Sequence, residues 1–498
     1  MTSSVQPPRS LETFPEFVAS RVNDGARFAG LFASAQGDDT RLLVALVENG
    51  TINTEEAIVP ATKPTYASLS QLVPSATWYE REIHDLFGLV ATDGIDLDPL
   101  VFAFPPGSPR PRPGSGRTLS RVDPDLTPLH AHVRGEGVFT IPYGPVRSGV
   151  FEAVEYVVET PGEDIPYLRT RIFYKHRGVE MRFEGASIDD GVLVAERCEG
   201  VASVAHALAY CEAVERIAGV EISRGASLIR VIHAELERIA NHLDSIIRHT
   251  EAAGQAVAYA RFSLHKEHVQ RLRARLCASR FGRGVVVPGG VRGPLQLGPA
   301  PLLDAITDFE DALKPDLALL MSTPSFLDRL RATGILSART AQRYGALGPL
   351  GRASGQNDDV RFTRPYAAYA HLGHQPSAPR NGGDALARQQ VRLDEITESL
   401  HLIRQATIQL DEGVVPRDTG WRVPVGTPSG EAFGWSESPQ GELLYLVTIR
   451  DGRLQRVKPR SASFHNLALF AATFPKNILT DFAFIEASFG LSIAGAAS

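Results

Sequence analysis

Residues 228–247 read LIRVIHAELERIANHLDSII, and this stretch has the clearest periodicity in the chain. Its apolar residues recur at spacings of three and four, at Leu228, Ile232, Leu236, Ile239, Leu243 and Ile246. That spacing places them on one face of a helix, so the stretch predicts a long amphipathic helix with a buried side.

Two ionisable residues of this helix point the same way as its apolar stripe. At about 100° per residue, Glu235 and His242 share a direction with Ile239 and Ile246. Buried ionisable groups are costly unless they are paired. They are interpreted either as a structural pair that fixes helix packing or as part of a proton path or redox-site wall.

Other elements are expected on both sides of this helix. Helices are predicted at residues 204–217, 264–276, 302–321 (strained at Pro315) and 385–410. Strands are predicted before them at residues 150–151, 156–158 and 168–174, and after them at residues 443–449. Residues 136–498 therefore predict a mainly α-helical domain with β elements at both ends.

The N-terminal part predicts a smaller α+β domain over residues 10–102. Residues 42–47 form a short apolar run typical of a buried strand, and residues 78–88 have helical spacing that Gly88 would end. Residues 103–135 are rich in Pro, Gly and Arg and predict a linker, whereas residues 1–9 predict a disordered tail. The expected fold class is α+β.

The composition excludes several classes of function. The chain has 498 residues, 43% of them hydrophobic and 22% charged, and its net charge of -6 gives no general attraction to nucleic acid or anionic lipid. No Walker loop or GxGxxG motif is present, which argues against nucleotide binding. No apolar run reaches the ~18 residues that a membrane span needs.

The cysteines are sparse. Cys198, Cys211 and Cys277 contain no CxxC pair, which argues against a disulfide framework and fits a reducing cytoplasm. An iron–sulfur cluster typically uses about four thiolates, so none is expected on this chain alone. We expect the three thiols to be small buried fillers.

Several segments together resemble one family. They are WYEREIHDLFG (78–88), GEGVFTIPYGPVRSG (135–149), YKHRGVE (174–180), SVAHALAYCEAVE (203–215), ELERIANHL (235–243), GRASGQNDDVR (351–361), PY (365–366), SFHN (463–466) and DFAFIEASFGLSIAG (481–495). In this order they resemble the complex I and membrane-bound [NiFe]-hydrogenase family, with a small partner subunit fused ahead of a large subunit. Formate hydrogenlyase-type large subunits and some bacterial complex I subunits have this fusion.

The resemblance also identifies what this sequence has lost. In the family's hydrogenases, two CxxC pairs bind nickel and iron, and the matching positions here hold Glu199, Ala202, Ser492 and Gly495. A soft-ligand nickel site needs thiolate sulfur, which these residues cannot supply. In the run ESPQG (437–441), Gln440 stands where an Arg or Lys is usual. The replacements Gly200, Ala202 and Gly495 are small, which favours a retained cavity. The chain is therefore expected to bind no metal.

The quinone-site pattern of the complex I relatives is also altered. In the relatives that this chain resembles, the quinone headgroup contacts a His in the loop matching residues 144–155 and a Tyr at the position of Gly200. In this chain that loop has Arg147 and no His. Arg147, Gly200, Glu235, His242, Arg352 and Asp359 are the candidate residues that line or brace the cavity. Asp359 paired with Arg361 on the surface is the ordinary alternative.

Some positions that carry chemistry survive. His176, Arg177 and Glu180 resemble the family's proton relay, which a carboxylate serves if partial burial raises its pKa toward neutrality. The alternative is an Arg177–Glu180 ion pair that holds the turn. His206 and Tyr210, four apart on one helix, are expected to be able to meet, and are more often core polar residues than ligands.

The resemblance implies an oxidoreductase subunit of NADH-quinone oxidoreductase or hydrogenase type. It would pass electrons from an iron–sulfur partner subunit toward a cavity for a quinone-type acceptor, beside integral membrane subunits. The expected location is cytoplasmic, on the inner face of the plasma membrane through partners. The alternatives are a non-catalytic scaffold and a formate hydrogenlyase-type hydrogenase subunit, against which the missing cysteines argue.

Overall fold

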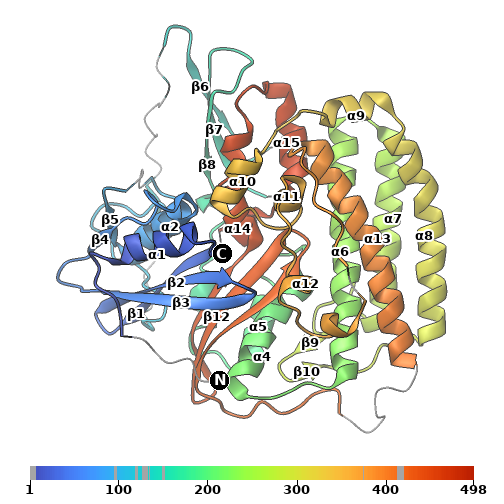
Figure 1. Ribbon diagram of the computed structural model, residues 1–498, viewed down its shortest axis with the longest axis horizontal. Helices are drawn as coiled ribbons and strands as arrows, with labels where there is room; N and C mark the ends of the chain where they lie inside the picture. Colours follow the sequence, from blue (N-terminus) through green and yellow to red (C-terminus); the bar gives the residue numbers. More distant parts are fainter. Residues whose placement is uncertain are drawn as a thin grey trace.

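The computed structural model describes residues 7–94, 98–117, 122–125, 133, 135–147, 152–373, 375–411 and 420–497. A small N-terminal part lies against one side of a larger part, in which long helices stand side by side (Figure 1). Helices and small sheets occur together, so the predicted α+β class is confirmed.

The N-terminal part is built on an antiparallel sheet in the order β1-β2-β3. Its strands are β1 (Arg27–Gln36), β2 (Asp39–Glu48) and β3 (Thr51–Val59), accompanied by a parallel pair, β4 (Thr65–Ala67) and β5 (Val90–Thr92), and two helices, α1 (Phe14–Asn23) and α2 (Thr77–Phe87). The apolar run at residues 42–47 lies in β2, as predicted. Gly88 ends α2 in the left-handed conformation, with φ 74°, which glycine adopts at no steric cost.

The segment predicted as a linker forms no helix or strand in residues 103–117 and 122–125. It nevertheless makes specific contacts with both parts of the chain. Arg112 donates to the carbonyl oxygens of Asp38 and Asp39, and the N–H groups of Gly114 and Gly116 donate to the Glu184 carboxylate. This segment therefore joins the two parts through hydrogen bonds as well as through the chain.

The second part contains three further sheets. They are β6 (Phe139–Tyr143), β7 (Glu155–Thr160) and β8 (Tyr167–Arg171), the short pair β9 (Val286–Val287) and β10 (Gly290–Val291), and β11 (Gly430–Ser438), β12 (Gly441–Arg450) and β13 (Arg453–Arg460). The strand predicted at residues 168–174 ends at Arg171, because a 3-10 turn at Phe173–Lys175 follows it. The strand predicted at residues 150–151 lies outside the described residues.

The helices of the second part include every predicted helix, each somewhat longer than expected. Their bounds are α3 (Val179–Phe183), α4 (Ile188–Ala195), α5 (Ser203–Ala218), α6 (Arg224–Ala252), α7 (Ala256–Cys277), α8 (Pro299–Met321), α9 (Pro324–Leu330), α10 (Ala338–Tyr344), α11 (Gly348–Ala353), α12 (Val360–Thr363), α13 (Ala385–Asp411), α14 (Ala462–Leu467), α15 (Phe482–Phe489) and α16 (Ile493–Ala496). Pro315 lies inside α8.

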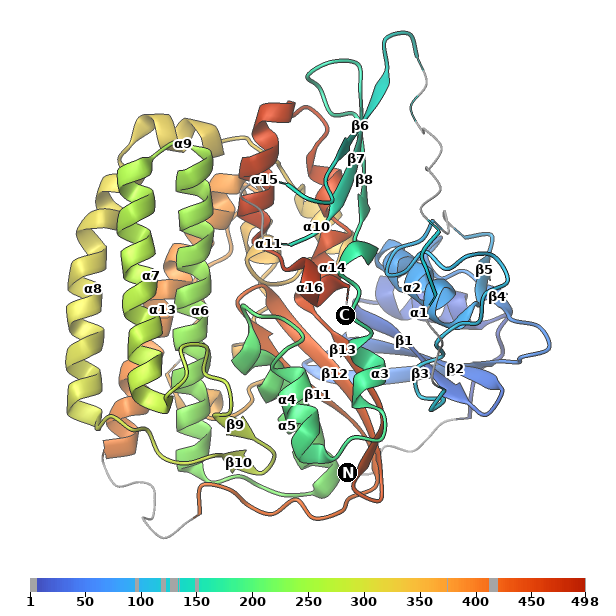
Figure 2. The same ribbon diagram turned by 180° about the vertical axis from the view of Figure 1, so that it is seen from behind.

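Two large hydrophobic clusters form the core. The first cluster contains residues of α4, α5, α6, α7, α8 and α13 and of the inner face of β12. Helix α5 lies across the sheet formed by β11, β12 and β13 (Figure 2). The other joins the N-terminal sheet and helices with β7, β8, α15 and α16. The C-terminal residues are therefore packed at the junction between the two parts. Within the described residues, no helix combines the length and hydropathy needed to cross a bilayer.

Candidate functional site

The N-terminal and C-terminal stretches in which the family carries its metal ligands meet in space. Glu199 lies between α4 and α5, whereas Ser492 and Gly495 lie at the turn from α15 into α16. A Cβ added to Gly495 would lie 2.8 Å from the carboxyl carbon of Glu199. The Glu199 carboxylate therefore occupies the space beside Gly495, and the prediction that small replacements leave a cavity there is wrong at this point.

Hydrogen bonds hold the Glu199 carboxylate from two sides. The Ser463 hydroxyl donates to Oε1 at 2.7 Å, and His206 Nε2 lies 3.0 Å from Oε2. The other ring nitrogen of His206 lies 2.6 Å from the Tyr445 hydroxyl, which donates to the Cys198 sulfur at 3.5 Å. We call these five residues (Cys198, Glu199, His206, Tyr445 and Ser463) the Glu199 cluster.

The Glu199 cluster contains an ion pair at neutral pH. Burial by itself would lower the pKa of His206, but hydrogen bonds with Cys198 and Glu199 raise it to about 9. The imidazole and the carboxylate are both fully buried and face each other. A buried charge is tolerated when it is paired and hydrogen-bonded, which this geometry provides. The expectation that His206 meets Tyr210 is wrong, because the Tyr210 hydroxyl donates to the Ile188 carbonyl.

A nickel–iron centre does not fit these residues. Glu199 offers oxygen, the Ser492 hydroxyl donates to Glu152, and Ala202 and Gly495 offer no side-chain ligand. Nickel in such a centre requires thiolate sulfur. Among the described residues, no three His, Cys, Asp or Glu side chains gather in a way that could hold a metal ion.

The predicted relay residues lie close together but do not interact as expected. Arg177 donates to the carbonyl oxygens of Arg197, Cys198 and Ala494, whereas Glu180 pairs with Arg456 and Lys458, both at 2.6 Å. The alternative Arg177–Glu180 ion pair is therefore wrong.

The pKa of Glu180 is shifted downward, opposite to the upward shift that a proton relay was expected to need. Burial would raise its pKa, but the neighbouring Arg456 guanidinium and Lys458 ammonium lower it below its usual value. Lys458 also contacts Glu82 of α2 at 2.6 Å, and burial raises the pKa of that carboxyl. His176 is half-buried near Glu180, and desolvation lowers its pKa. Among the carboxyl groups that contact Lys458, Glu82 is the one whose pKa is raised. Sequence reasoning did not single out Glu82.

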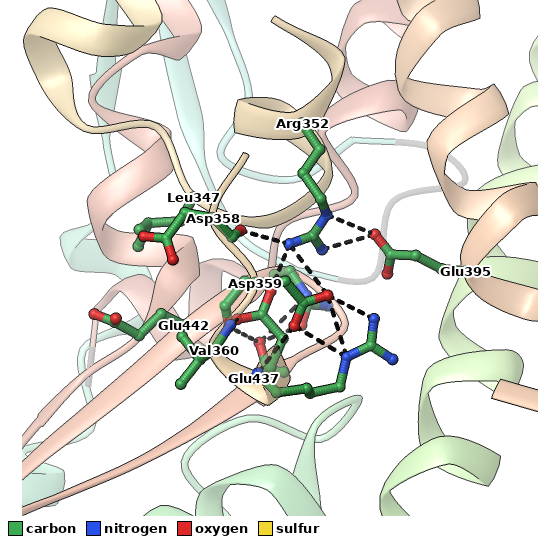
Figure 3. Close-up of polar contacts among 12 residues, drawn as sticks. Leu347, Arg352, Asp358, Asp359, Val360, Glu395, Glu437 and Glu442 are labelled. Carbon is green, nitrogen blue, oxygen red and sulfur yellow. Dashed lines mark hydrogen bonds and ion pairs between the residues drawn. The ribbon is translucent and has the colours of Figure 1, made fainter. Parts of the chain in front are cut away.

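Four other predicted residues belong to one buried network of charges. The network is formed by Glu235, Arg238, His242, Arg352, Asp359, Arg361, Glu395, Glu398 and Glu437, and we call it the Arg352 network. Arg352 binds Glu395 at 2.7 Å and Glu437 at 3.0 Å, as Figure 3 shows. Arg238 joins Glu235 to Glu395, and Glu395 accepts from His242 at 2.8 Å.

The sequence-based expectations for this network are partly confirmed. The predicted Asp359–Arg361 pair exists at 2.7 Å, but it is buried and not on the surface. Glu235 and His242 do not pair with each other, but Arg238 links Glu235 to Glu395, the partner of His242. Sequence reasoning missed Glu395, Arg238 and Glu437, and only Glu437, in the run ESPQG, gave a signal that could have identified it.

Arg147 lies outside both groups, and Gly200 directly follows Glu199 without joining its hydrogen bonds. Arg147 pairs with Glu486 at 2.7 Å and packs over the rings of Tyr143 and Tyr156. Gly200 is exposed, and open space surrounds the position where a Cβ would stand. The position where the resemblance places a tyrosine therefore carries no side chain.

An open cavity lies where β6 of the β6–β7 hairpin ends, between this strand and the start of α15. Its volume is about 560 Å³, and its lining is formed by Ile141, Tyr143, Ala252, Ala253, Arg329, Leu479, Thr480, Phe482, Ala483 and Phe484. Tyr143 and Phe482 contact each other edge to face. This volume and this mainly apolar lining are typical of the sites that bind small molecules in proteins.

In this two-part fold the stretches around Glu199 and Gly495 meet at one buried point. Residues 19–109 match the family of the 30 Kd subunit of respiratory-chain NADH dehydrogenase, and residues 253–426 match that of its 49 Kd subunit. The chain belongs to this complex I and membrane-bound hydrogenase family of oxidoreductase subunits.

Individual relatives come from both branches of the family. The chain is 30% identical to the carbon monoxide-induced hydrogenase of Rhodospirillum rubrum over 66% of its own length and 90% of that protein. It is 30% identical to the membrane-bound hydrogenase subunit alpha of Pyrococcus furiosus over 68% and 83%. It is 28% identical to the NADH-quinone oxidoreductase C/D subunit of Rhodopseudomonas palustris over 88% and 83%.

Proposed function

We propose that this chain is the electron-transferring subunit of a membrane-associated complex I-like assembly. It receives electrons from an iron–sulfur partner subunit and delivers them to a quinone-type acceptor, without a nickel–iron centre of its own. Integral membrane subunits hold it at the inner face of the plasma membrane. Its relatives bear the names of membrane-bound hydrogenase and NADH-quinone oxidoreductase subunits, which supports this assignment.

The cavity beside the β6–β7 hairpin is the proposed binding site of the quinone-type acceptor. Its aromatic and aliphatic lining suits the apolar ring and chain of a quinone, and Arg329 adds a cation at its wall. Arg329 stacks over Phe484 at 4.6 Å and donates to the Thr480 carbonyl, so it is held in place. The space next to Gly495 is filled by Glu199, which leaves this cavity as the better acceptor site.

The absence of a nickel–iron centre is supported by the donor set of the Glu199 cluster. A carboxylate that already accepts from His206 and Ser463 has its oxygens engaged. A proton relay through His176, Arg177 and Glu180 stays a prediction, and the lowered pKa of Glu180 assigns it the role of an ionised partner of Lys458.

The test is quinone reduction by the purified assembly, with this chain bound to its iron–sulfur and membrane partners. Ala483 is exposed and lines the cavity, so Ala483→Trp fills the cavity without entering the core. The control is Ala338→Trp, at an exposed position at the start of α10. We expect Ala483→Trp to lower turnover at least about tenfold, since a misplaced reactant loses its near-attack geometry, and Ala338→Trp to leave it unchanged.

A non-catalytic scaffold is the second candidate, and Glu199 favours it. A retained active site keeps open space, whereas here a side chain fills the former ligand position. Wild-type assembly that reduces no quinone, with all partners bound, would establish the scaffold. Equal turnover in wild type and Ala483→Trp would instead place the acceptor elsewhere.

A further inference from the structure

Two carboxylates face each other on the β11–β12 hairpin. Glu437 and Glu442 are directly opposite in the register of the two strands. Side chains at such positions stand about 5 Å apart at their Cβ atoms, and like charges there repel. Both are almost completely buried. Two carboxylates in this arrangement cannot both ionise without strong compensation.

The cations around the pair are unevenly shared. Glu442 contacts three guanidiniums, those of Arg27 at 2.5 Å, Arg364 and Arg460. Glu437 contacts one, that of Arg352, which also binds Glu395 more closely. The Glu437 carboxylate also accepts a hydrogen bond from the N–H of Val360 at 3.3 Å. Glu442 is therefore the member of the pair that is stabilised as an anion.

We propose that Glu437 and Glu442 form a proton-holding pair, in which Glu442 stays ionised and Glu437 takes up and releases one proton. The step moves one proton and no electrons. The neutral carboxyl group of Glu437 gives its proton to water, and the carboxylate that forms is held by Arg352 and Val360 N–H. When the proton returns, Arg352 keeps its two bonds to Glu395.

Every charged neighbour of Glu437 fits this assignment. Arg352 of α11, Arg238 of α6 and Arg361 of α12 favour its anion, whereas Asp359 disfavours it. Arg364, which follows α12, and Arg460, at the end of β13, also act on it, but both bind Glu442. Burial outweighs the cations and raises the pKa of Glu437 to about 7. Tyr366 lies near as well, but its hydroxyl accepts from the backbone N–H of Glu437.

A cavity adjoins the Arg352 network. A small cavity of about 10 Å³ is lined by Arg352, Asp359, Pro376, Ser377, Ala378, Val391, Asp394, Glu395 and Glu398. Such a volume has room for about one water molecule when polar groups surround it. A water in this cavity would lie beside Arg352, the residue whose guanidinium binds Glu437.

The position of the pair links it to the rest of the site. The turn between the two glutamates contains Gln440, whose side chain donates to the Gly490 carbonyl, and whose own carbonyl accepts from Asn466. Gly490 and Asn466 are close in sequence to Ser492 and Ser463. A proton supply to the acceptor from Glu437 rests on the proposed function, since quinone reduction consumes protons. The exchange of a proton by Glu437 itself does not depend on the proposed function.

Infrared titration of the full-length chain tests the exchange. The carbonyl stretch of a protonated carboxyl is followed from pH 5 to 9 in wild type, Glu437→Gln and the control Glu431→Gln, which lies exposed on the same strand. We expect one band, titrating near pH 7, to be absent from Glu437→Gln and present in Glu431→Gln. An identical set of bands in wild type and Glu437→Gln would overturn the proposal.

A second variant keeps the test valid if Glu437→Gln fails to fold. Glu442→Gln removes the opposing charge and frees three cations, so the Glu437 band should titrate at a lower pH; an unchanged midpoint would overturn the pairing. Turnover of the assembly is then measured against pH in Glu437→Gln. Infrared exchange without quinone turnover in any assembly would leave Glu437 as a proton site and refute the acceptor function alone.

Discussion

Two buried polar regions lie close together in this protein and deal with charge in opposite ways. The Glu199 cluster holds one carboxylate against one imidazolium, with hydroxyl groups completing the bonds. The Arg352 network holds five carboxylates on three guanidiniums among its members, and Glu437 also faces Glu442. In the first region a buried charge is balanced by a partner, and in the second it is balanced by a proton. This difference explains why only the second region is suited to exchange protons near neutral pH.

Removing the shared cation should have the largest effect. Arg352→Ala leaves Glu395 and Glu437 without their common guanidinium, and breaking a buried ion pair on one side costs about 3 to 5 kcal/mol. Urea denaturation measures the free energy of unfolding. Arg339→Ala, on the exposed surface of α10, is the control and should change it by less than about 0.5 kcal/mol. Equal losses in the two variants would contradict the central place of Arg352.

Glu437→Gln should change how stability depends on pH at the acidic side. The folded-state pKa of about 7 lies above the ordinary 4.5, so the native state binds the proton more tightly. This stabilisation is complete below pH 4.5 and is lost as the pH rises to 7, a fall of up to about 3 kcal/mol at 1.36 kcal/mol per pKa unit. In Glu437→Gln that fall should disappear from the denaturation profile. A profile that keeps the same slope would contradict it.

Glu199→Gln should alter a different pH window. The pKa of His206 is raised from 6.5 to about 9, so its contribution is complete below pH 6.5 and is lost as the pH rises through 9. Glutamine keeps the shape but removes the charge. Because Cys198 also raises the pKa, we expect the loss to shrink by about 2 kcal/mol and not to vanish. Nuclear magnetic resonance titration of His206 in wild type and Glu199→Gln would measure this pKa directly. An unchanged midpoint would refute the ion pair.

Gly495→Ala should give the smallest of these effects. The new Cβ would lie 2.8 Å from the Glu199 carboxyl carbon, and overpacking of this kind costs about 1 to 3 kcal/mol. Gly293→Ala, where a Cβ meets open space, is the matched control. The double variant Gly495→Ala with Glu199→Ala should recover part of the loss, since the two side chains no longer collide. Additive losses would show that Glu199 does not fill this space.

The sequence by itself determined the elements that local pattern governs. The apolar spacing in residues 228–247 specified α6, and Gly88 marked the end of α2, because periodicity and left-handed backbone are properties of neighbouring residues. The order of short motifs also indicated the family, and the letters at 199, 202, 492 and 495 were enough to show that thiolates are absent there.

Only the tertiary structure decided which charged groups face one another. Glu180 was expected to bind a proton, yet Arg456 and Lys458, more than 270 residues away along the chain, hold it ionised. Glu437 stood in the run ESPQG without an assigned role, yet the β11–β12 register sets it against Glu442. The pKa of a buried group depends on partners brought together by packing, because electrostatic interactions act through space and not along the sequence.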